Sequence, residues 1–352
     1  MSSILIIQYF QYLYIFEHFK ISELSNLVDG LSLTLDYSLT FLKLASLWIH
    51  RRVFHKILAA MENDWRECVI DQHLSLMTIK ASVSHFYSNA MLSFNGIAAV
   101  LYVLGDYVIR FVYSANNYNN TLRQLPIKML LPFETEQSPI FELLVVTLFL
   151  HVILISFTVA VLNGLIFTLV LHVSGQIDII CQEFRNISVN AFPYRSSACI
   201  LGMLVERHNK VYAFSESIEK LFSFIALMQV VWNTLVICCL GFIIIISVHN
   251  ETDVFVFVKA TLAYFAVMIE AFIICFAGEY LSLKSKSIAD AAYESLWYDM
   301  PPNQSKTISF MIMRSQKQLS ITAGKMMDMS FEALTSIMKA SASYVSVLHA
   351  MY

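Results

Sequence analysis

Charged residues are scarce in this 352-residue chain, because Asp, Glu, Lys and Arg together make up only 14% of it. A soluble domain of similar length carries about 25% of such residues. Hydrophobic residues account for 57% of the chain, and they are gathered in several blocks rather than in one tail. The composition therefore excludes an ordinary soluble protein and predicts a polytopic membrane protein.

Several chemical signatures are also missing. The six cysteines show no metal-ligand spacing and none lies in a segment expected outside the cell, so we expect neither a metal site nor a disulfide framework. The start of the chain lacks a basic n-region and a small-residue cleavage site, so we read no signal peptide. No H-E-x-x-H, G-x-S-x-G or phosphate-binding loop occurs, and the intramembrane acids are too scattered for a catalytic pair. We expect no enzyme activity and no cofactor.

Hydrophobic runs divide the chain into seven predicted spanning helices without an internal repeat. The first run has roughly 13 residues, which is short for a span and predicts a shortened first helix. Polar segments between the spans predict two amphipathic helices, one around KILAAMENDWREC within 50–82 and one over 303–323, after the helix-breaking Pro301-Pro302 pair. The spans are expected at 4–16, 27–49, 85–113, 140–173, 221–248, 254–277 and 330–352.

Lys and Arg are distributed unevenly between the two sides of these spans. The loops after spans two, four and six hold 5, 4 and 6 basic residues, whereas the alternate loops hold 1, 2 and none. The basic side is cytosolic by the positive-inside rule, which places the N-terminus inside and the C-terminus outside. Asn119 and Asn250 head glycosylation sequons in loops that this orientation places outside the cell.

The second span contains three charged residues, Asp29, Asp36 and Lys43, spaced seven apart and so nearly on one helix face. Charges within a span are costly and normally turn toward protein or water. We expect Asp29 to lie at the interface and Lys43 to snorkel to the cytosolic side. A turn of these side chains toward the protein interior stays open as the alternative.

The last 23 residues, 330–352, are long enough to cross a hydrocarbon core of roughly 30 Å. One face of the predicted helix is small and partly polar, and the opposite face carries ordinary packing residues. A spanning helix with such a stripe either packs tightly on a neighbour or lines a water path. The small face consists of Ser336, Ala340, Ser343, Val347 and Ala350, and the opposite face of Phe331, Leu334, Met338, Val345 and Leu348.

Two other classes of seven-span or polytopic protein fit poorly. A G-protein-coupled receptor has its N-terminus outside, and the chain lacks both a D/E-R-Y after span three and an N-P-x-x-Y in span seven. A secondary transporter is disfavoured because the two halves of the chain contain no paired spans interrupted by Gly or Pro.

Three longer segments and one short motif resemble the insect odorant receptor family, and more closely its hymenopteran odorant-tuning members. The segments are LPFETEQSPIFELL at 131–144, LVLHVSGQIDII at 169–180 and the stretch from ESLWYDMPP to SYVSVL at 294–348, and the motif is DWRE at 64–67. Gustatory receptors are the nearest alternative. They close with T-Y followed five residues later by Q-F, and the residues after Tyr344 lack that pattern.

The resemblance implies an all-α membrane protein with seven transmembrane helices, N-terminus inside and C-terminus outside, in the insect odorant receptor channel fold. It implies a subunit of a ligand-gated non-selective cation channel that forms a heterotetramer with an odorant co-receptor. The setting would be the plasma membrane of an olfactory sensory neuron dendrite, with volatile odorants and membrane lipids as partners and no nucleic acid. The implied divisions are spans one to six (1–278), cytosolic anchor helices (279–329) and a pore-lining last helix (330–352).

Site residues follow from the same resemblance. Alignment on Ser343-Tyr344 places the pore and gate at Ser343, Val347, Ala350 and Met351, where apolar side chains would close the pore by excluding water. The ligand pocket is expected in the outer halves of spans two, three, four and six, chosen by depth and helical spacing. Its candidates are Leu31, Ser32, Leu35, Leu101, Tyr102, Gly105, Thr147, Leu148, His151, Leu262, Tyr264 and Phe265.

Overall fold

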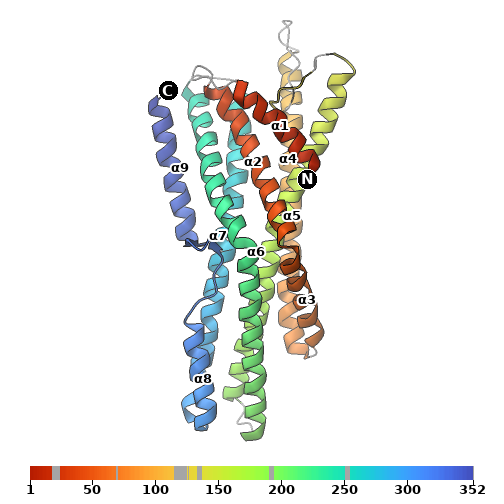
Figure 1. The fold of residues 1–352 in the computed structure, drawn as a ribbon. Helices are drawn as coiled ribbons and strands as arrows, with labels where there is room; N and C mark the ends of the chain where they lie inside the picture. Colours follow the sequence, from red (N-terminus) through yellow and green to blue (C-terminus); the bar gives the residue numbers. More distant parts are fainter. Residues whose placement is uncertain are drawn as a thin grey trace.

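The computed structural model describes residues 1–17, 24–68, 70–114, 125, 127–132, 137–189, 194–249 and 254–351. These residues form an almost entirely helical molecule with one short hairpin (Figure 1). The elements are α1 (Ser2–Glu17), α2 (Leu24–Ile49), α3 (Arg51–Glu67), α4 (Asp71–Ser114), α5 (Ile140–Val189), α6 (Tyr194–His249), α7 (Val254–Glu294), η2 (Trp297–Asp299), α8 (Pro302–Ser315), β1 (Thr322–Ala323), β2 (Met327–Asp328) and α9 (Phe331–Met351).

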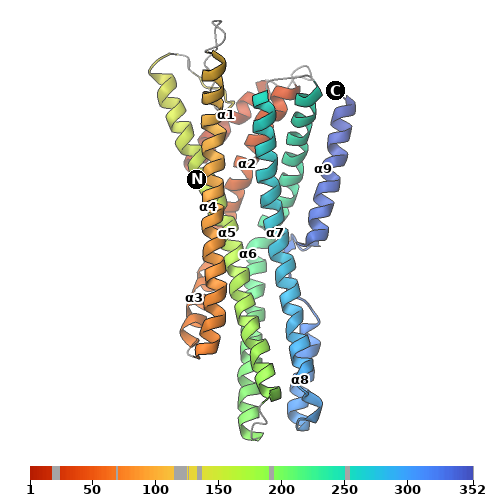
Figure 2. The ribbon, with the colours of Figure 1, turned by 180° about the vertical axis from the view of Figure 1, so that it is seen from behind.

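Four long helices, α4 to α7, form the axis of the molecule (Figures 1 and 2). Each of these four is long and apolar enough to cross a membrane. Helices α1, α2 and α9 lie beside their upper halves, and α3 and α8 lie beside their lower halves. The 50 residues of α5 extend about 75 Å, more than twice the hydrocarbon thickness. The molecule therefore has a spanning half of seven helices and a cytosolic half, as the predicted all-α membrane architecture requires.

Most of the segments that we predicted to be polar loops are helical and form continuations of the long helices. Helix α6 continues unbroken through 194–249, where the chain has no proline and only two glycines, Gly202 and Gly241. Helix α7 likewise continues through position 278, where we placed a domain boundary. With no helix breaker present, propagation costs little once the helix has started. The spanning and cytosolic halves are therefore joined by continuous helices.

The amphipathic helix predicted over 303–323 is only partly correct. Helix α8 ends at Ser315, and the following residues form the β1–β2 hairpin. Gly324 and Lys325 have φ of 58° and 61°, as a type I′ turn requires, and the Met326 N–H donates to the Ala323 carbonyl at 3.0 Å. The Gly324 N–H also donates to the Ser223 carbonyl of α6 at 2.9 Å. Bonds to neighbouring segments thus replace the intrahelical bonds that the periodicity suggested.

The largest apolar core lies in the cytosolic half, where α5, α6, α7 and α8 meet. Its margins are held by polar pairs between helices. The Asp178 carboxylate of α5 accepts from Lys284 of α7 at 2.7 Å and lies 3.0 Å from Lys80 of α4. His208 of α6 is buried with its Nε2 3.1 Å from Ser315 Oγ of α8. Burial, reinforced by Arg314, lowers the pKa of His208 to about 4, so this histidine is neutral at cytosolic pH.

The segment that enters α9 crosses α7 at unusually short range. A Cβ placed on Gly278 would lie 2.1 Å from the Met329 carbonyl oxygen. Met329 is 1% exposed, and its N–H donates to the Ile321 carbonyl at 2.8 Å. The Ser330 hydroxyl then caps α9 by accepting from the Ala333 N–H at 3.3 Å. The first turn of the last helix is therefore fixed in direction by backbone contact with α7.

We predict that Gly278→Ala displaces this crossing. The added methyl group cannot coexist with a backbone carbonyl at 2.1 Å, so the connector or α7 has to shift, at a cost of about 3 kcal/mol. Surface expression and the thermal unfolding midpoint of the purified protein should both fall. Gly202→Ala is the matched control, because a Cβ there meets nothing within 4 Å and alanine favours the helix by about 1 kcal/mol. Equal surface expression and equal unfolding midpoints of the two variants would contradict a close backbone crossing at Gly278.

Candidate functional site

Helix α9 contacts the rest of the chain along a single stripe. Ala333, Ile337 and Ser341 follow one another at steps of four and are 2–3% exposed. The Ser341 hydroxyl donates to the Thr234 carbonyl of α6 at 3.2 Å. Further along, Val345 Cγ2 would lie 3.1 Å from a Cβ on Gly241, so the absence of a side chain there permits close approach. The packing face of α9 thus looks toward α6 and α7.

The small-residue stripe of α9 lies on the other side. Ser336, Ser343 and Ala350 are exposed, Ala340 is partly exposed, and Val347 has 57% of its surface exposed. Within the described chain this stripe therefore serves no packing role. The pore and gate positions Ser343, Val347 and Ala350 share this outward face, whereas the side chain of Met351 lies outside the described residues. The outward face remains available to water or to another subunit.

The twelve predicted pocket residues divide into two groups in the structure. Leu101, Thr147, Leu262 and Phe265 are exposed on the surface of the bundle, with exposed fractions of 52%, 51% and 58% for Leu101, Leu262 and Phe265. The others that can be described are buried or partly buried: Leu31, Leu35, Tyr102, Gly105, Leu148, His151 and Tyr264. The side chain of Ser32 lies outside the described residues, as do the sequons at Asn119 and Asn250.

Four of the buried or partly buried pocket candidates fall into two apolar clusters. Leu31, Leu35 and Tyr264 pack against the outer halves of α6 and α7 around Phe242. Leu148 belongs to a cluster where α1, α2 and α5 meet, together with the residue Tyr37, which periodicity did not select. The structure therefore separates the predicted site into a region beside α6 and α7 and a region beside α1 and α5.

Tyr37 and His151 form the polar part of the second cluster. Their rings are stacked with centroids 5.5 Å apart, and the Tyr37 hydroxyl lies 3.4 Å from His151 Nδ1. Tyr37 is 3% exposed and His151 is 9% exposed. Among the residues that the structure describes, His151 Nε2 is buried without a hydrogen-bond partner, and so are both amide atoms of Gln11 on α1. Buried polar atoms rarely remain unpaired, so these atoms offer bonds to a bound molecule.

The prediction that Lys43 snorkels to the cytosolic side is wrong. Lys43 is 2% exposed and forms an ion pair with Glu270 of α7, which is 6% exposed. The alternative, a turn toward the protein interior, is the one the structure adopts. A partner of opposite charge removes the need to reach water, because each charge replaces part of the other's hydration. The pair ties α2 to α7 inside the spanning half.

We predict that Glu270→Gln destabilises the bundle by about 3 kcal/mol or more, because it leaves the Lys43 ammonium buried without its ion-pair partner. Thermal unfolding of the detergent-solubilised protein measures this loss. The double variant Lys43→Met/Glu270→Leu removes both charges and should recover most of the midpoint, since buried ion pairs replaced by apolar residues are often tolerated. A double variant as unstable as Glu270→Gln would contradict the attribution of the lost stability to an unpaired Lys43 ammonium.

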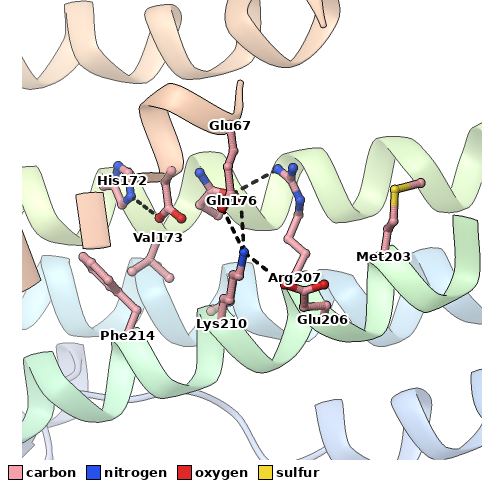
Figure 3. Close-up of a pocket in the computed structure, with 11 residues that line it drawn as sticks. Glu67, His172, Val173, Gln176, Met203, Glu206, Arg207, Lys210 and Phe214 are labelled. Carbon is pink, nitrogen blue, oxygen red and sulfur yellow. Dashed lines mark hydrogen bonds and ion pairs between the residues drawn. The ribbon is translucent and has the colours of Figure 1, made fainter. Parts of the chain in front are cut away.

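A polar cavity of about 330 Å³ lies between α3, α5 and α6 in the cytosolic half (Figure 3). Its charged side chains are already paired with one another. Lys210 lies 3.0 Å from Glu67 and 3.2 Å from Glu206, and His172 Nε2 lies 2.9 Å from Asp64. Figure 3 shows these groups bridging α3 to the two longer helices. We interpret this cavity as a junction between helices, distinct from the pocket expected in the outer half.

The junction explains the position of two segments that the sequence singled out. Asp64 and Glu67 belong to the DWRE motif, and His172 and Gln176 belong to the segment 169–180. Asp64 pairs with His172, and Arg207 Nη1 donates to Gln176 Oε1 at 3.2 Å. Sequence reasoning identified the motifs but missed their mutual contact, because 108 residues separate Asp64 from His172.

Continuous helices that span a membrane and extend into a cytosolic bundle define an integral all-α membrane protein. The chain matches the 7tm Odorant receptor family over residues 23–342, so it belongs to that family. This is a family of receptors rather than enzymes. Membership of it favours the odorant receptor interpretation over a gustatory receptor or a G-protein-coupled receptor.

Among curated relatives, Odorant receptor 22c of Drosophila melanogaster is 26% identical over 235 residues, covering 64% of this chain and 57% of the relative. Odorant receptor 13a of the same species is 24% identical over 248 residues, covering 65% and 58%. The chain thus spans a little more than half the length of these relatives.

Two solved structures share the fold. The insect olfactory receptor OR5 from Machilis hrabei in complex with eugenol superimposes with a TM-score of 0.78 at 15% identity, covering all of this chain and 87% of the other. A second structure of the same receptor gives a TM-score of 0.79 at 16% identity, covering 99% of this chain and 86% of the other. The predicted insect odorant receptor fold is confirmed.

Proposed function

We propose that the chain is an odorant-binding subunit of a ligand-gated, non-selective cation channel. It would assemble with an odorant co-receptor as a heterotetramer in the plasma membrane of an olfactory neuron dendrite. The observation that carries this proposal is the small, partly polar face of α9, which no other described part of the chain covers. A spanning helix with a free wettable face requires neighbours, and several copies around an axis would enclose a water path.

The proposed gate lies on this face. Val347 is apolar and 57% exposed near the outer end of α9, and Met351 follows one turn later. A ring of such side chains from several subunits would exclude water and ions until the helices spread. Ser343, one turn before Val347, would contribute a hydroxyl to the water path. The small side chain of Ala350 would not narrow that path.

The cytosolic half supplies the means of assembly in this proposal, with residues 279–329 as the anchor. Seven large apolar or aromatic side chains of this segment are exposed, among them Tyr293 at 66%, Phe310 at 67% and Met313 at 62%. Exposed groups of this kind on α7 and α8 are typical of a protein interface. Their burial between subunits would hold the α9 helices around a common axis.

The proposed ligand pocket lies in the outer half of the bundle beside α1 and α5, where it is lined by Tyr37, Leu148, His151 and Gln11. Leu31, Leu35 and Tyr264 line the separate region beside α6 and α7. Apolar walls with few polar groups suit small volatile molecules, because dispersion and shape then provide most of the affinity. The unpaired atoms of His151 and Gln11 would bond the single carbonyl or hydroxyl that many such molecules carry.

Co-expression with the co-receptor tests the function as a whole. Odorant-evoked cation current across a broad panel is expected from cells that express both subunits. Absence of any current, with both subunits demonstrated at the surface, would contradict the proposal.

We predict that Val347→Ala raises resting or odorant-evoked conductance of the complex, since the smaller side chain widens the apolar constriction. Current–voltage recordings of cells with matched surface expression measure the effect. Val345→Ala is the matched control, because it makes the same change on the face of α9 that packs against Gly241. If Val345→Ala alters conductance and Val347→Ala does not, the gate lies elsewhere.

We predict that Tyr37→Phe raises the half-maximal concentration of odorants that carry a carbonyl or hydroxyl by about fivefold. The variant removes the hydroxyl that lies 3.4 Å from His151 Nδ1 and orients the imidazole whose Nε2 would bond the ligand. The expected loss corresponds to one hydrogen bond of about 1 kcal/mol. Hydrocarbon odorants should be unaffected, because the ring and its stacking on His151 remain. Dose–response curves for paired odorants of equal size provide the comparison. Tyr9→Phe serves as the control, since Tyr9 is 61% exposed. A uniform shift for both odorant classes would indicate a general structural effect instead.

A further inference from the structure

The end of α2 and the beginning of α3 carry an exposed group of basic and aromatic side chains. Trp48 and Ile49 close α2 with 65% and 73% of their surfaces exposed. Arg51, Arg52 and Lys56 follow immediately on α3, and all three are exposed. At 100° per residue, the three cations lie within about 140° of the helix circumference. We call Trp48, Ile49, Arg51, Arg52 and Lys56 the α2–α3 patch.

The apolar and charged parts of the α2–α3 patch are arranged as a membrane boundary requires. Trp48 belongs to the last turn of a spanning helix, at the level where tryptophan is enriched in membrane proteins. The Arg51 guanidinium carbon lies 5.3 Å from the centre of the Trp48 ring, so one cation is held against the aromatic plane. The orientation of the bundle places this boundary at the cytosolic leaflet.

The charged side chains at the two ends of α3 differ in whether they form ion pairs. The acids of its last turns are engaged: Glu62 with Arg66, Asp64 with His172, and Glu67 with Lys210. By contrast, within the part of the chain that the structure describes, neither Arg52 nor Lys56 forms an ion pair. The unneutralised cations of α3 are therefore those nearest the membrane. The cytosolic leaflet carries the anionic lipids that such cations attract.

The patch is also located where lipid can reach it. Figures 1 and 2 both place α3 at the periphery of the bundle, on the side away from α8 and α9. The opposite face of α3 is the packed one, because Ile57 is 1% exposed and joins the cytosolic core. The basic face consequently looks out of the bundle, and assembly through α8 and α9 would leave it uncovered.

We propose that the α2–α3 patch binds the head groups of anionic phospholipids of the inner leaflet. Arg52 and Lys56 contact the phosphate and carboxylate oxygens, Arg51 does so while stacked on Trp48, and Trp48 and Ile49 lie among the acyl chains. The bound lipid fixes the depth at which α2 leaves the membrane. The same helix carries Lys43, whose partner Glu270 connects it to α7.

Native mass spectrometry of the full-length chain in detergent tests this proposal. Equal amounts of phosphatidylserine and phosphatidylcholine are added, and bound molecules of each are counted. The unmodified chain should prefer phosphatidylserine. Arg52→Gln should weaken that binding about fivefold, and Arg51→Gln/Arg52→Gln/Lys56→Gln about 100-fold, since each cation near an anionic surface contributes a factor of about five.

Two further variants separate the patch from general effects of charge and folding. Arg66→Gln/Lys286→Gln/Lys306→Gln removes three exposed cations farther into the cytosolic half and should leave the preference unchanged. Arg51→Lys/Arg52→Lys keeps the charge and should retain most of it. Phosphatidylserine binding that survives the patch triple variant, an equal loss in the control triple variant, or no preference in the unmodified chain would each overturn the proposal.

Discussion

The arrangement of the whole molecule depends on one close backbone crossing. At Gly278 the connector before α9 passes α7 so closely that a methyl group would overlap the Met329 carbonyl oxygen. This contact fixes where α9 begins and, through the Ser330 cap, in which direction it rises. The direction in turn decides that Ala333, Ile337 and Ser341 face α6 and that the small-residue stripe faces outward. A bulkier residue at one position of α7 would therefore disturb the origin of α9 and the packing of its buried stripe on α6.

Helix α7 joins this crossing to the interior of the spanning half. Glu270 lies eight residues before Gly278, about 12 Å along the helix, and pairs with Lys43 of α2. Because the pair is buried, separating its charges would cost several kcal/mol, so α2 and α7 are constrained to move together. Tyr37 lies on the same α2, less than two turns before Lys43. The buried pair and the crossing at Gly278 thus connect α2 to the origin of α9 through α7.

Much of this architecture could be predicted from sequence, because burial in lipid leaves strong compositional and positional signals. Blocks of apolar residues identified the spans, and the basic loops set their orientation. In α9 the 3–4 spacing placed the small residues on the outward face, but it missed the packed stripe of Ala333, Ile337 and Ser341, and Phe331 of the predicted packing face is 43% exposed. The pocket was harder: Leu101, Thr147, Leu262 and Phe265 have the right depth but lie on the surface. In a membrane both the exterior and the interior of a bundle are apolar, so periodicity cannot distinguish them. Nor can sequence reveal that Lys43 meets an acid 227 residues away.

The segments that carry the family resemblance build the scaffold rather than the proposed pocket. DWRE and 169–180 meet at the cytosolic junction, where Asp64 pairs with His172 and Glu67 with Lys210. The segment 294–348 supplies α8, the hairpin and most of α9. A chain can therefore belong to this family through its cytosolic core and last helix whatever it binds. In the proposed function the choice of ligand comes from side chains such as Tyr37 and His151, whose burial follows from three-dimensional contacts among α1, α2 and α5.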